Sequence, residues 1–178
     1  AVDGALWSNG YDKGIFCAIQ YAGRGGIFCK EPAKGVENVK MISIEEAKRA
    51  VVEDFSMFEE WLDKYEYLIE LGNKLEPFSD TLKTDDRLIK GCQSRVWLDT
   101  SFRDGKLFFS ADSDALITKG IISLLINVYS GRTPKEIAED DFSFIESIGL
   151  KENLSPTRAG GLASMINTIR EEAVKYNV

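Results

Sequence analysis

Hydrophobic and polar residues alternate with a regular period from residue 41 onward, but residues 1–40 show no sustained period and carry many of the 15 glycines. The chain starts at Ala1 without a methionine, and Met41 begins the patterned part. We therefore predict a poorly determined N-terminal tail over residues 1–40 and one compact domain over residues 41–178.

Two S-x-x-E capping boxes occur at Ser43 and Ser56. In such a box the serine and glutamate side chains satisfy unpaired backbone N–H groups reciprocally, so each box predicts the start of a helix. The second helix should carry an apolar face at i, i+3, i+4 and i+7 spacing and should end at Gly72. The residues of this face, which we interpret as core, are Phe58, Trp61, Leu62, Tyr65, Leu68 and Ile69.

Two strand-like segments, 95–102 and 106–110, flank the dipeptide Asp104-Gly105. Asp-Gly is a strong signal for the two-residue turn of a β-hairpin, because both central positions of that turn need a positive φ. We predict an antiparallel hairpin here, the one sheet element that the pattern specifies.

The apolar segment after the hairpin predicts a helix that runs to Tyr129 and is closed by Gly131. Asp112 and Asp114 precede this segment, where acidic side chains interact favourably with the positive end of a helix dipole. Their simplest role is to cap the helix. We expect the helix to be buried against the hairpin.

Further helices are predicted toward the C-terminus. Residues 133–136 combine an N-cap threonine, a proline at the first helical position and a glutamate at the third. Residues 142–148 predict a helix that Gly149 stops, and Ser155-Pro156 repeats the cap and the proline before the last helix. The apolar stripe of that helix is Leu162, Met165, Ile166, Ile169 and Ala173. The predicted fold class is α+β, with several helices packed against a small antiparallel sheet.

The composition narrows the classes of molecule that the chain could bind. With 44% hydrophobic residues, the chain of 178 residues can bury one ordinary core. Its formal net charge is -7, and no run of lysine and arginine could follow a phosphate backbone, so we expect no nucleic-acid partner. The longest apolar run, 121–128, is far shorter than the roughly 20 residues that span a bilayer. We therefore expect a soluble protein without membrane association.

The chain contains no histidine, which excludes Ser-His-Asp catalysis, Cys-His catalysis and imidazole ligation of metals. Its 3 cysteines, Cys17, Cys29 and Cys92, are too few for a disulfide framework, and no pair has the CxxC spacing of zinc or redox sites. The start of the chain also lacks the pattern of a secretion signal. We expect a reducing, cytoplasmic location.

Cys92 is the one cysteine of the patterned part, and it stands in a loop or at the edge of the first strand. Gly91 permits backbone geometry closed to other residues, and the charges of Lys90 and Arg95 can favour thiolate over thiol, whose ordinary pKa is about 8.5. A nucleophilic role is therefore physically reasonable. Local chemistry also fits a small buried hydrophobic residue, the commoner role of a lone cysteine, and does not decide between the two.

Four segments of the patterned part carry a family resemblance. They are Gly91-Cys92-Gln93-Ser94-Arg95-Val96-Trp97-Leu98; Tyr67-Leu68-Ile69-Glu70-Leu71-Gly72; Ala111-Asp112-Ser113-Asp114-Ala115 with Lys119-Gly120; and Leu154-Ser155-Pro156-Thr157-Arg158 with Gly161-Leu162. In their order and separation they resemble the SufE family of sulfur acceptors. The resemblance extends from about residue 41 to the C-terminus, leaves out residues 1–40, and gives no role to Cys17 or Cys29.

The resemblance implies a SufE/IscU-like α+β fold with the acceptor cysteine in a loop at one end. It also implies a reaction in which a pyridoxal-phosphate cysteine desulfurase forms a persulfide and the Cys92 thiolate attacks its outer sulfur. The implied partners are a SufS-type desulfurase and, downstream, a SufBCD-type scaffold of iron–sulfur cluster assembly. The chain would be a sulfur carrier and desulfurase activator rather than a stand-alone enzyme, without a cofactor of its own, because the pyridoxal phosphate belongs to the partner.

Supporting or partner-binding residues are also expected from these segments: Gln93, Ser94, Arg95, Asp114 and Arg158. Gln93 and Ser94 could hydrogen-bond the thiolate or persulfide, or simply hold the turn. Arg158 could anchor the cysteine loop or meet the partner, or it could be a solvated residue in the first turn of the last helix. The resemblance places the loop of Asp114 near the cysteine loop.

Three other functions fit parts of the sequence. An IscU-type scaffold also receives sulfur, but a cluster site usually needs several thiolates, sometimes with a histidine, and the patterned part has one cysteine. A single-cysteine peroxidase or thiol redox protein would use the same thiol. A pure interaction module would leave Cys92 buried and inert.

Overall fold

The structure, a computed structural model, describes residues 42–177, in which two helices precede a β-hairpin and four helices follow it. The helices are α1 (Ile44–Ser56), α2 (Trp61–Asn73), α3 (Leu116–Tyr129), α4 (Pro134–Glu139), α5 (Phe144–Ser147) and α6 (Pro156–Tyr176). The strands are β1 (Val96–Arg103) and β2 (Lys106–Ser113), and single 3-10 turns lie at Asp80–Leu82, Asp85–Arg87 and Lys151–Asn153. The α+β class is confirmed, while the predicted tail over residues 1–40 and its boundary lie outside the described residues.

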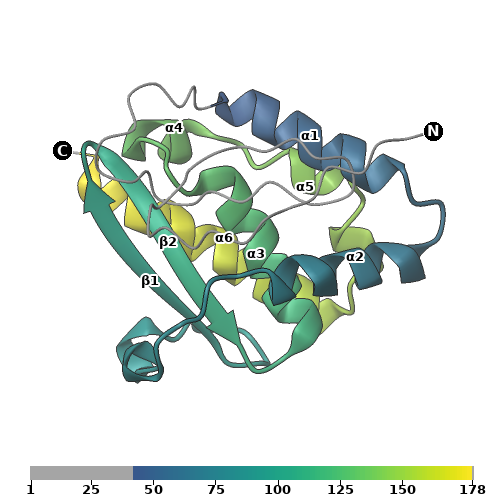
Figure 1. The fold of residues 1–178 in the computed structure, drawn as a ribbon, viewed down its shortest axis with the longest axis horizontal. Coiled ribbons are helices and arrows are strands. Elements are labelled where there is room, and N and C mark those ends of the chain that lie inside the picture. The colour runs from purple at the N-terminus through teal and green to yellow at the C-terminus, as the bar shows by residue number, and fades with distance from the viewer. Residues whose placement is uncertain (1–41, 178) are drawn as a thin grey trace, which may run out of the picture.

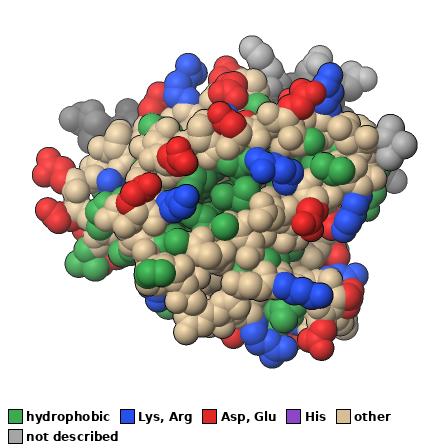
Figure 2. All heavy atoms as spheres, turned by 180° about the vertical axis from the view of Figure 1, so that it is seen from behind, with side chains coloured by type: hydrophobic (Ala, Val, Ile, Leu, Met, Phe, Trp, Pro, Cys, Tyr) green, Lys and Arg blue, Asp and Glu red, His purple; other side chains and the backbone are tan. Residues whose placement is uncertain are grey.

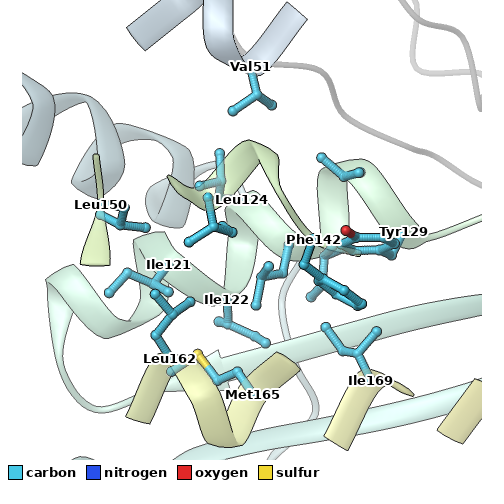
Figure 3. Close-up of a cluster of buried hydrophobic side chains, with 14 of the residues drawn as sticks. Val51, Ile121, Ile122, Leu124, Tyr129, Phe142, Leu150, Leu162, Met165 and Ile169 are labelled. Atoms are coloured by element: carbon cyan, nitrogen blue, oxygen red, sulfur yellow. The ribbon is translucent and has the colours of Figure 1, made fainter. Parts of the chain in front are cut away.

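Helix α3 is the centre of the molecule. It lies between the hairpin on one side and helices α1 and α2 on the other, and α6 runs behind it (Figure 1). Every residue from Gly120 to Tyr129 is buried, because a helix that is apolar all round needs neighbours on every side. Figure 3 shows the core that results, in which Leu124 lies on the side of α3 that faces Val51 of α1, and Ile122 lies on the side that faces Met165 of α6.

The hairpin forms as predicted. Asp104 has φ 50° and Gly105 has φ 75°, which gives the two-residue turn the twist that antiparallel strands require. The strands pair in register from Arg103 opposite Lys106 to Val96 opposite Ser113, so the second strand is longer than the predicted segment 106–110. One face of the hairpin is buried against α3, through residues that include Val96, Leu98, Leu107, Phe109 and Ala111.

The two capping boxes behave differently. Ser43 caps α1 as predicted: the backbone N–H of Glu46 donates to Ser43 Oγ at 3.2 Å, and Glu46 accepts from the Ser43 backbone. Ser56 does not start a helix, because α1 continues through it to bury Phe55, which is 2% exposed, and α2 begins only at Trp61. Tertiary packing of α1 therefore overrides the second local signal.

The apolar face predicted for the second helix is correct only in part. Trp61 and Tyr65 pack against the core from partly buried positions, and Leu68 is fully buried. Leu62, however, is 68% exposed, and the buried face also includes Tyr67 and Leu71. The buried face is therefore rotated from the predicted one, toward the side on which α2 packs against α3.

Gly72 is not a helix stop, because it lies inside α2, which ends at Asn73. Its role is to let α2 approach α3 closely. A Cβ at Gly72 would lie 2.9 Å from the backbone nitrogen of Gly120, and a Cβ at Gly120 would lie 2.2 Å from the carbonyl oxygen of Leu68. The Ser123 hydroxyl then donates to the Leu71 carbonyl at 2.9 Å across the same contact.

Asp112 and Asp114 do not cap α3, whose N-cap residue is Ala115. The pairing of Val96 with Ser113 extends β2 through Asp112, so this carboxylate belongs to the strand and pairs with Lys119 at 2.7 Å and Lys83 at 3.0 Å. Among the other predicted ends, Gly131 and Gly149 have the expected positive φ, and the capping box of residues 133–136 is formed. The helix predicted over residues 142–148 is shorter, because Phe142 has φ 59° and α5 begins at Phe144, and Ser155 precedes α6 without a side-chain capping hydrogen bond. The stripe predicted for the last helix is also confirmed, with Ile166 partly buried and its other members fully buried.

Candidate functional site

Cys92 lies in the loop that connects the 3-10 turn Asp85–Arg87 to β1. The N–H of Ile89 donates to the Val96 carbonyl at 2.8 Å, which closes the base of this loop. Gly91 has φ 88°, a conformation that favours glycine, and a Cβ there would meet Ser164 Oγ of α6 at 2.6 Å. The loop is thus shaped by Gly91 and held close to α6.

The thiol of Cys92 is half-buried and unbonded to another cysteine. It donates to the Gly161 carbonyl of α6 at 3.6 Å, and burial raises the pKa of Cys92 above its ordinary value. The expectation that Lys90 and Arg95 favour the thiolate is therefore wrong for this conformation. Instead, the Arg95 guanidinium lies over the Trp97 ring, 5.0 Å from its centroid, and burial of the sulfur favours the protonated thiol.

A hollow of about 70 Å³ opens beside the thiol. It lies between the cysteine loop, α3 and α6, and its lining consists of Cys92, Gln93, Ser94, Thr118, Ile121, Thr157, Arg158, Gly161 and Met165. Gln93, Thr157 and Arg158 are exposed and form its rim, whereas Ile121 and Met165 are buried. Figure 3 labels the last two, which come from α3 and α6 and lie at the edge of the core.

The structure brings together most of the predicted site residues. Gln93, Ser94 and Arg158 line the hollow with Cys92, whereas Arg95 and Asp114 do not. The Asp114 carboxylate accepts from the backbone N–H of Arg95 at 3.0 Å, so these two residues fasten the end of the cysteine loop to the segment before α3.

Some lining residues were not predicted. Thr157 and Gly161 stand inside the quoted motifs but were assigned no role, and a Cβ at Gly161 would lie 3.4 Å from Cys92 Sγ. Thr118 is 7% exposed and donates to Ser94 Oγ at 3.4 Å. Its one sequence signal is that it is a polar residue in a largely apolar helix, and that signal does not identify a partner.

A cluster of charged side chains connects the segment before the cysteine loop to the hairpin and α3. Lys83 and Lys119 both reach Asp112, and although burial works to raise the pKa of Asp112, their hydrogen bonds hold it below its ordinary value. Lys83 also lies over the Trp97 ring, 5.7 Å from the centroid. Trp97 is therefore covered by cations on the surface next to the cysteine loop.

Three further features concern what the protein could bind: its surface charges, its possible metal ligands and the character of its helices. Figure 2 shows one face of the molecule, on which lysine and arginine are interspersed with acidic side chains around a patch of hydrophobic ones. Within residues 42–177, the cysteine and acidic side chains form no group of three or more that could hold a metal ion. None of the helices in this same range has the length and apolar character needed to cross a membrane.

Comparisons with known proteins give consistent matches. The model of the SufE family, described as an Fe–S metabolism associated domain, matches residues 49–173. An uncharacterized SufE-like protein of Rhizobium etli is 40% identical over 128 residues, which cover 69% of this chain and 86% of that protein. A second such protein, from Rhizobium meliloti, is 38% identical over 128 residues, covering 69% and 91%.

A solved structure has a similar fold. It is described as the solution structure of a hypothetical protein from Thermus thermophilus, and it covers 72% of this chain and 94% of its own, with a TM-score of 0.61. At 21% sequence identity, this match speaks for the fold alone.

Proposed function

The chain belongs to the SufE family, whose domain is associated with Fe–S metabolism, and from this premise we propose that Cys92 accepts a persulfide sulfur from a cysteine desulfurase. The membership confirms the resemblance of the four sequence segments. The observation that carries the proposal is the position of the Cys92 thiol, at the wall of a hollow whose rim is exposed.

In the proposed step, the Cys92 thiolate attacks the outer sulfur of the desulfurase persulfide. A new S–S bond forms at Cys92 Sγ, the S–S bond of the donor breaks, and the electron pair leaves with the donor's cysteine sulfur. The proton that Cys92 loses neutralises the donor thiolate. One sulfur atom is transferred with no net oxidation or reduction, so the chain needs no redox cofactor for this step.

The resting geometry requires a change before transfer. Because burial raises the pKa of Cys92, its thiol must lose the proton after the desulfurase binds. A thiolate is repelled by the Gly161 carbonyl that now accepts its S–H, so deprotonation favours movement of the sulfur away from α6. In the isolated protein, partial burial and the raised pKa make the thiol less reactive than an exposed one.

The partners in this proposal are a SufS-type desulfurase, which holds the pyridoxal phosphate, and a SufBCD-type scaffold as the downstream acceptor. Arg158 on the rim of the hollow is the cation best placed to meet a partner, because it is exposed and lines the same hollow as Cys92. The chain acts as a carrier and activator of the desulfurase.

The proposal is tested by alanine formation from cysteine by the desulfurase. Wild-type protein should stimulate turnover, and Cys92→Ser should abolish this stimulation. A variant with both Cys17→Ser and Cys29→Ser is the matched control and should stimulate like wild type.

Other outcomes would favour other functions. Equal stimulation by Cys92→Ser would contradict the carrier role and indicate an interaction module. Peroxide-dependent turnover of the protein alone would indicate a thiol peroxidase. A stable cluster after anaerobic reconstitution would indicate a scaffold.

A further inference from the structure

Thr118 is a buried polar side chain beside the hollow. It lies in the first turn of α3 and is 7% exposed, and it follows the partly buried Ile117. Burying a hydroxyl costs free energy unless it is hydrogen-bonded. The Thr118 hydroxyl, which lies beside the hollow, therefore needs a hydrogen-bond partner.

In the resting protein, the hydrogen bond donated by the Thr118 hydroxyl is long. Its hydroxyl donates to Ser94 Oγ at 3.4 Å, whereas good O–H···O hydrogen bonds are about 2.5–3.0 Å long. A hydroxyl can rotate to suit a better acceptor. Ser94 stands two positions after Cys92 in the same loop, and all three side chains line the hollow.

The hollow has room for a transferred sulfur. Its volume is about 70 Å³, several times the roughly 10–15 Å³ that a water-sized guest needs on the same measure. Gly161 contributes to this room, because a Cβ at that position would lie only 3.4 Å from Cys92 Sγ. The hollow therefore has enough volume for one further atom on the sulfur.

The outer sulfur of a persulfide ionises more readily than a thiol, because the second sulfur atom stabilises the negative charge. A buried anion needs hydrogen-bond donors to offset its desolvation. Ile121 and Met165 offer none, while Arg158 supplies positive charge from the rim. Thr118 is the buried side chain of the lining that carries an O–H group.

From these contacts, and resting on the proposed function, we propose that Thr118 binds the transferred sulfur: its hydroxyl turns from Ser94 and donates a hydrogen bond to the outer sulfur of the Cys92 persulfide. No covalent bond changes in this step. The hydrogen bond stabilises the loaded protein between acceptance of the sulfur and its delivery.

The test loads the full chain with inorganic polysulfide, which transfers one sulfur atom to the Cys92 thiolate and becomes one sulfur shorter. The Cys17→Ser and Cys29→Ser background confines loading to Cys92. After desalting, intact-mass analysis follows the loss of the added sulfur with time. Thr118→Val, which keeps the volume and removes the hydroxyl, should lose the sulfur about tenfold faster than the parent protein, and Thr118→Ser should restore retention.

A second readout separates sulfur binding from a purely structural role. The rate at which the loaded protein reacts with an alkylating agent, measured against pH, reports the pKa of the persulfide. Thr118→Val should raise this pKa, because it removes a donor to the anion. Equal lifetimes and equal pH profiles for Thr118→Val and its parent would overturn the proposal; Thr118→Ala gives the same test if valine prevents folding.

This experiment distinguishes failure of the proposed role of Thr118 from failure of the proposed carrier function. If polysulfide loads Cys92 but no desulfurase does, the carrier role fails, while the lifetimes still decide the role of Thr118. If both reagents load Cys92 and the lifetimes are equal, the role of Thr118 alone fails.

Discussion

At the scale of single residues, the protonation of the Cys92 thiol depends on the residues that pack against it. Its neighbours in sequence, Lys90 and Arg95, suggested an activated thiolate, but Lys90 is exposed and Arg95 lies over Trp97. Packing against Gly161 instead buries part of the side chain, and this burial raises the pKa of Cys92 and favours the neutral thiol. Sequence motifs predict Cys92 as the acceptor, whereas its burial depends on α6, which lies far along the chain.

This state gives a testable pH dependence. Because burial raises the pKa of Cys92, its thiolate fraction near neutral pH is smaller than that of a free thiol, and the thiolate is the species that reacts. In the Cys17→Ser and Cys29→Ser background, the rate of alkylation should rise with pH through a midpoint higher than that of the same chain unfolded in urea. A folded midpoint at or below the unfolded one would contradict the burial described for Cys92.

Thr118 shows the limit of prediction at this scale. Gln93 and Ser94 adjoin Cys92 and were predicted from that adjacency, and both line the hollow. Thr118 enters the site only because α3 passes beside the cysteine loop, a contact that no local pattern encodes. Its place could be known only from the fold.

At the scale of elements, the same local motif had two outcomes. Ser43 starts α1, but Ser56, with an identical S-x-x-E spacing, ends it. The difference lies in Phe55, the residue before Ser56, which is buried in the core as part of the last turn of α1. Propensity and capping predict most of the helices here, and packing decides where they end.

The contrast between the two serines can be measured. Ser43→Ala removes the hydroxyl that accepts from the Glu46 N–H, so it should lower the free energy of unfolding by about 1 kcal/mol. Ser56→Ala removes only an exposed bond to the Glu53 carbonyl and should cost less than about 0.5 kcal/mol. Urea denaturation compares the two; a larger loss for Ser56→Ala would contradict the observed helix boundaries.

The contact between α2 and α3 depends on glycine. Gly120→Ala would place a methyl group 2.2 Å from the Leu68 carbonyl oxygen, and backbone cannot move aside cheaply. We expect this variant to lose at least about 3 kcal/mol of unfolding free energy.

Gly160→Ala is its matched control. Gly160 lies in α6, where a Cβ would meet nothing within 4 Å, so alanine should stabilise the helix by about 0.5–1 kcal/mol. Urea unfolding of both variants checks the pair. Similar effects of the two substitutions would show that α2 and α3 are not in close contact.

At the scale of the whole molecule, the pieces that make the site come from three separate parts of the chain. The cysteine loop, α3 and α6 each contribute to the hollow, and the hairpin holds the loop beside α3. The α+β class, the hairpin and the order of the helices could be predicted from residues 41–178. How the parts meet depends on the core around α3, which composition alone does not specify.

The domain boundary is a prediction at this scale. Residues 42–177 hold a buried core and line the hollow beside Cys92, so deletion of residues 1–40 should leave folding and sulfur acceptance intact. Circular dichroism and the desulfurase assay check both properties. A truncated chain that is soluble but accepts no sulfur would place the boundary elsewhere.

The most direct measurement is intact-mass analysis of the protein after incubation with a cysteine desulfurase and cysteine, before and after reductant. Transfer to Cys92 predicts a reductant-labile gain of roughly 32 Da, one sulfur atom, that Cys92→Ser abolishes and the Cys17→Ser and Cys29→Ser variant keeps. No gain on the wild type, with a desulfurase shown to load another acceptor, would contradict the role of Cys92 as a sulfur carrier.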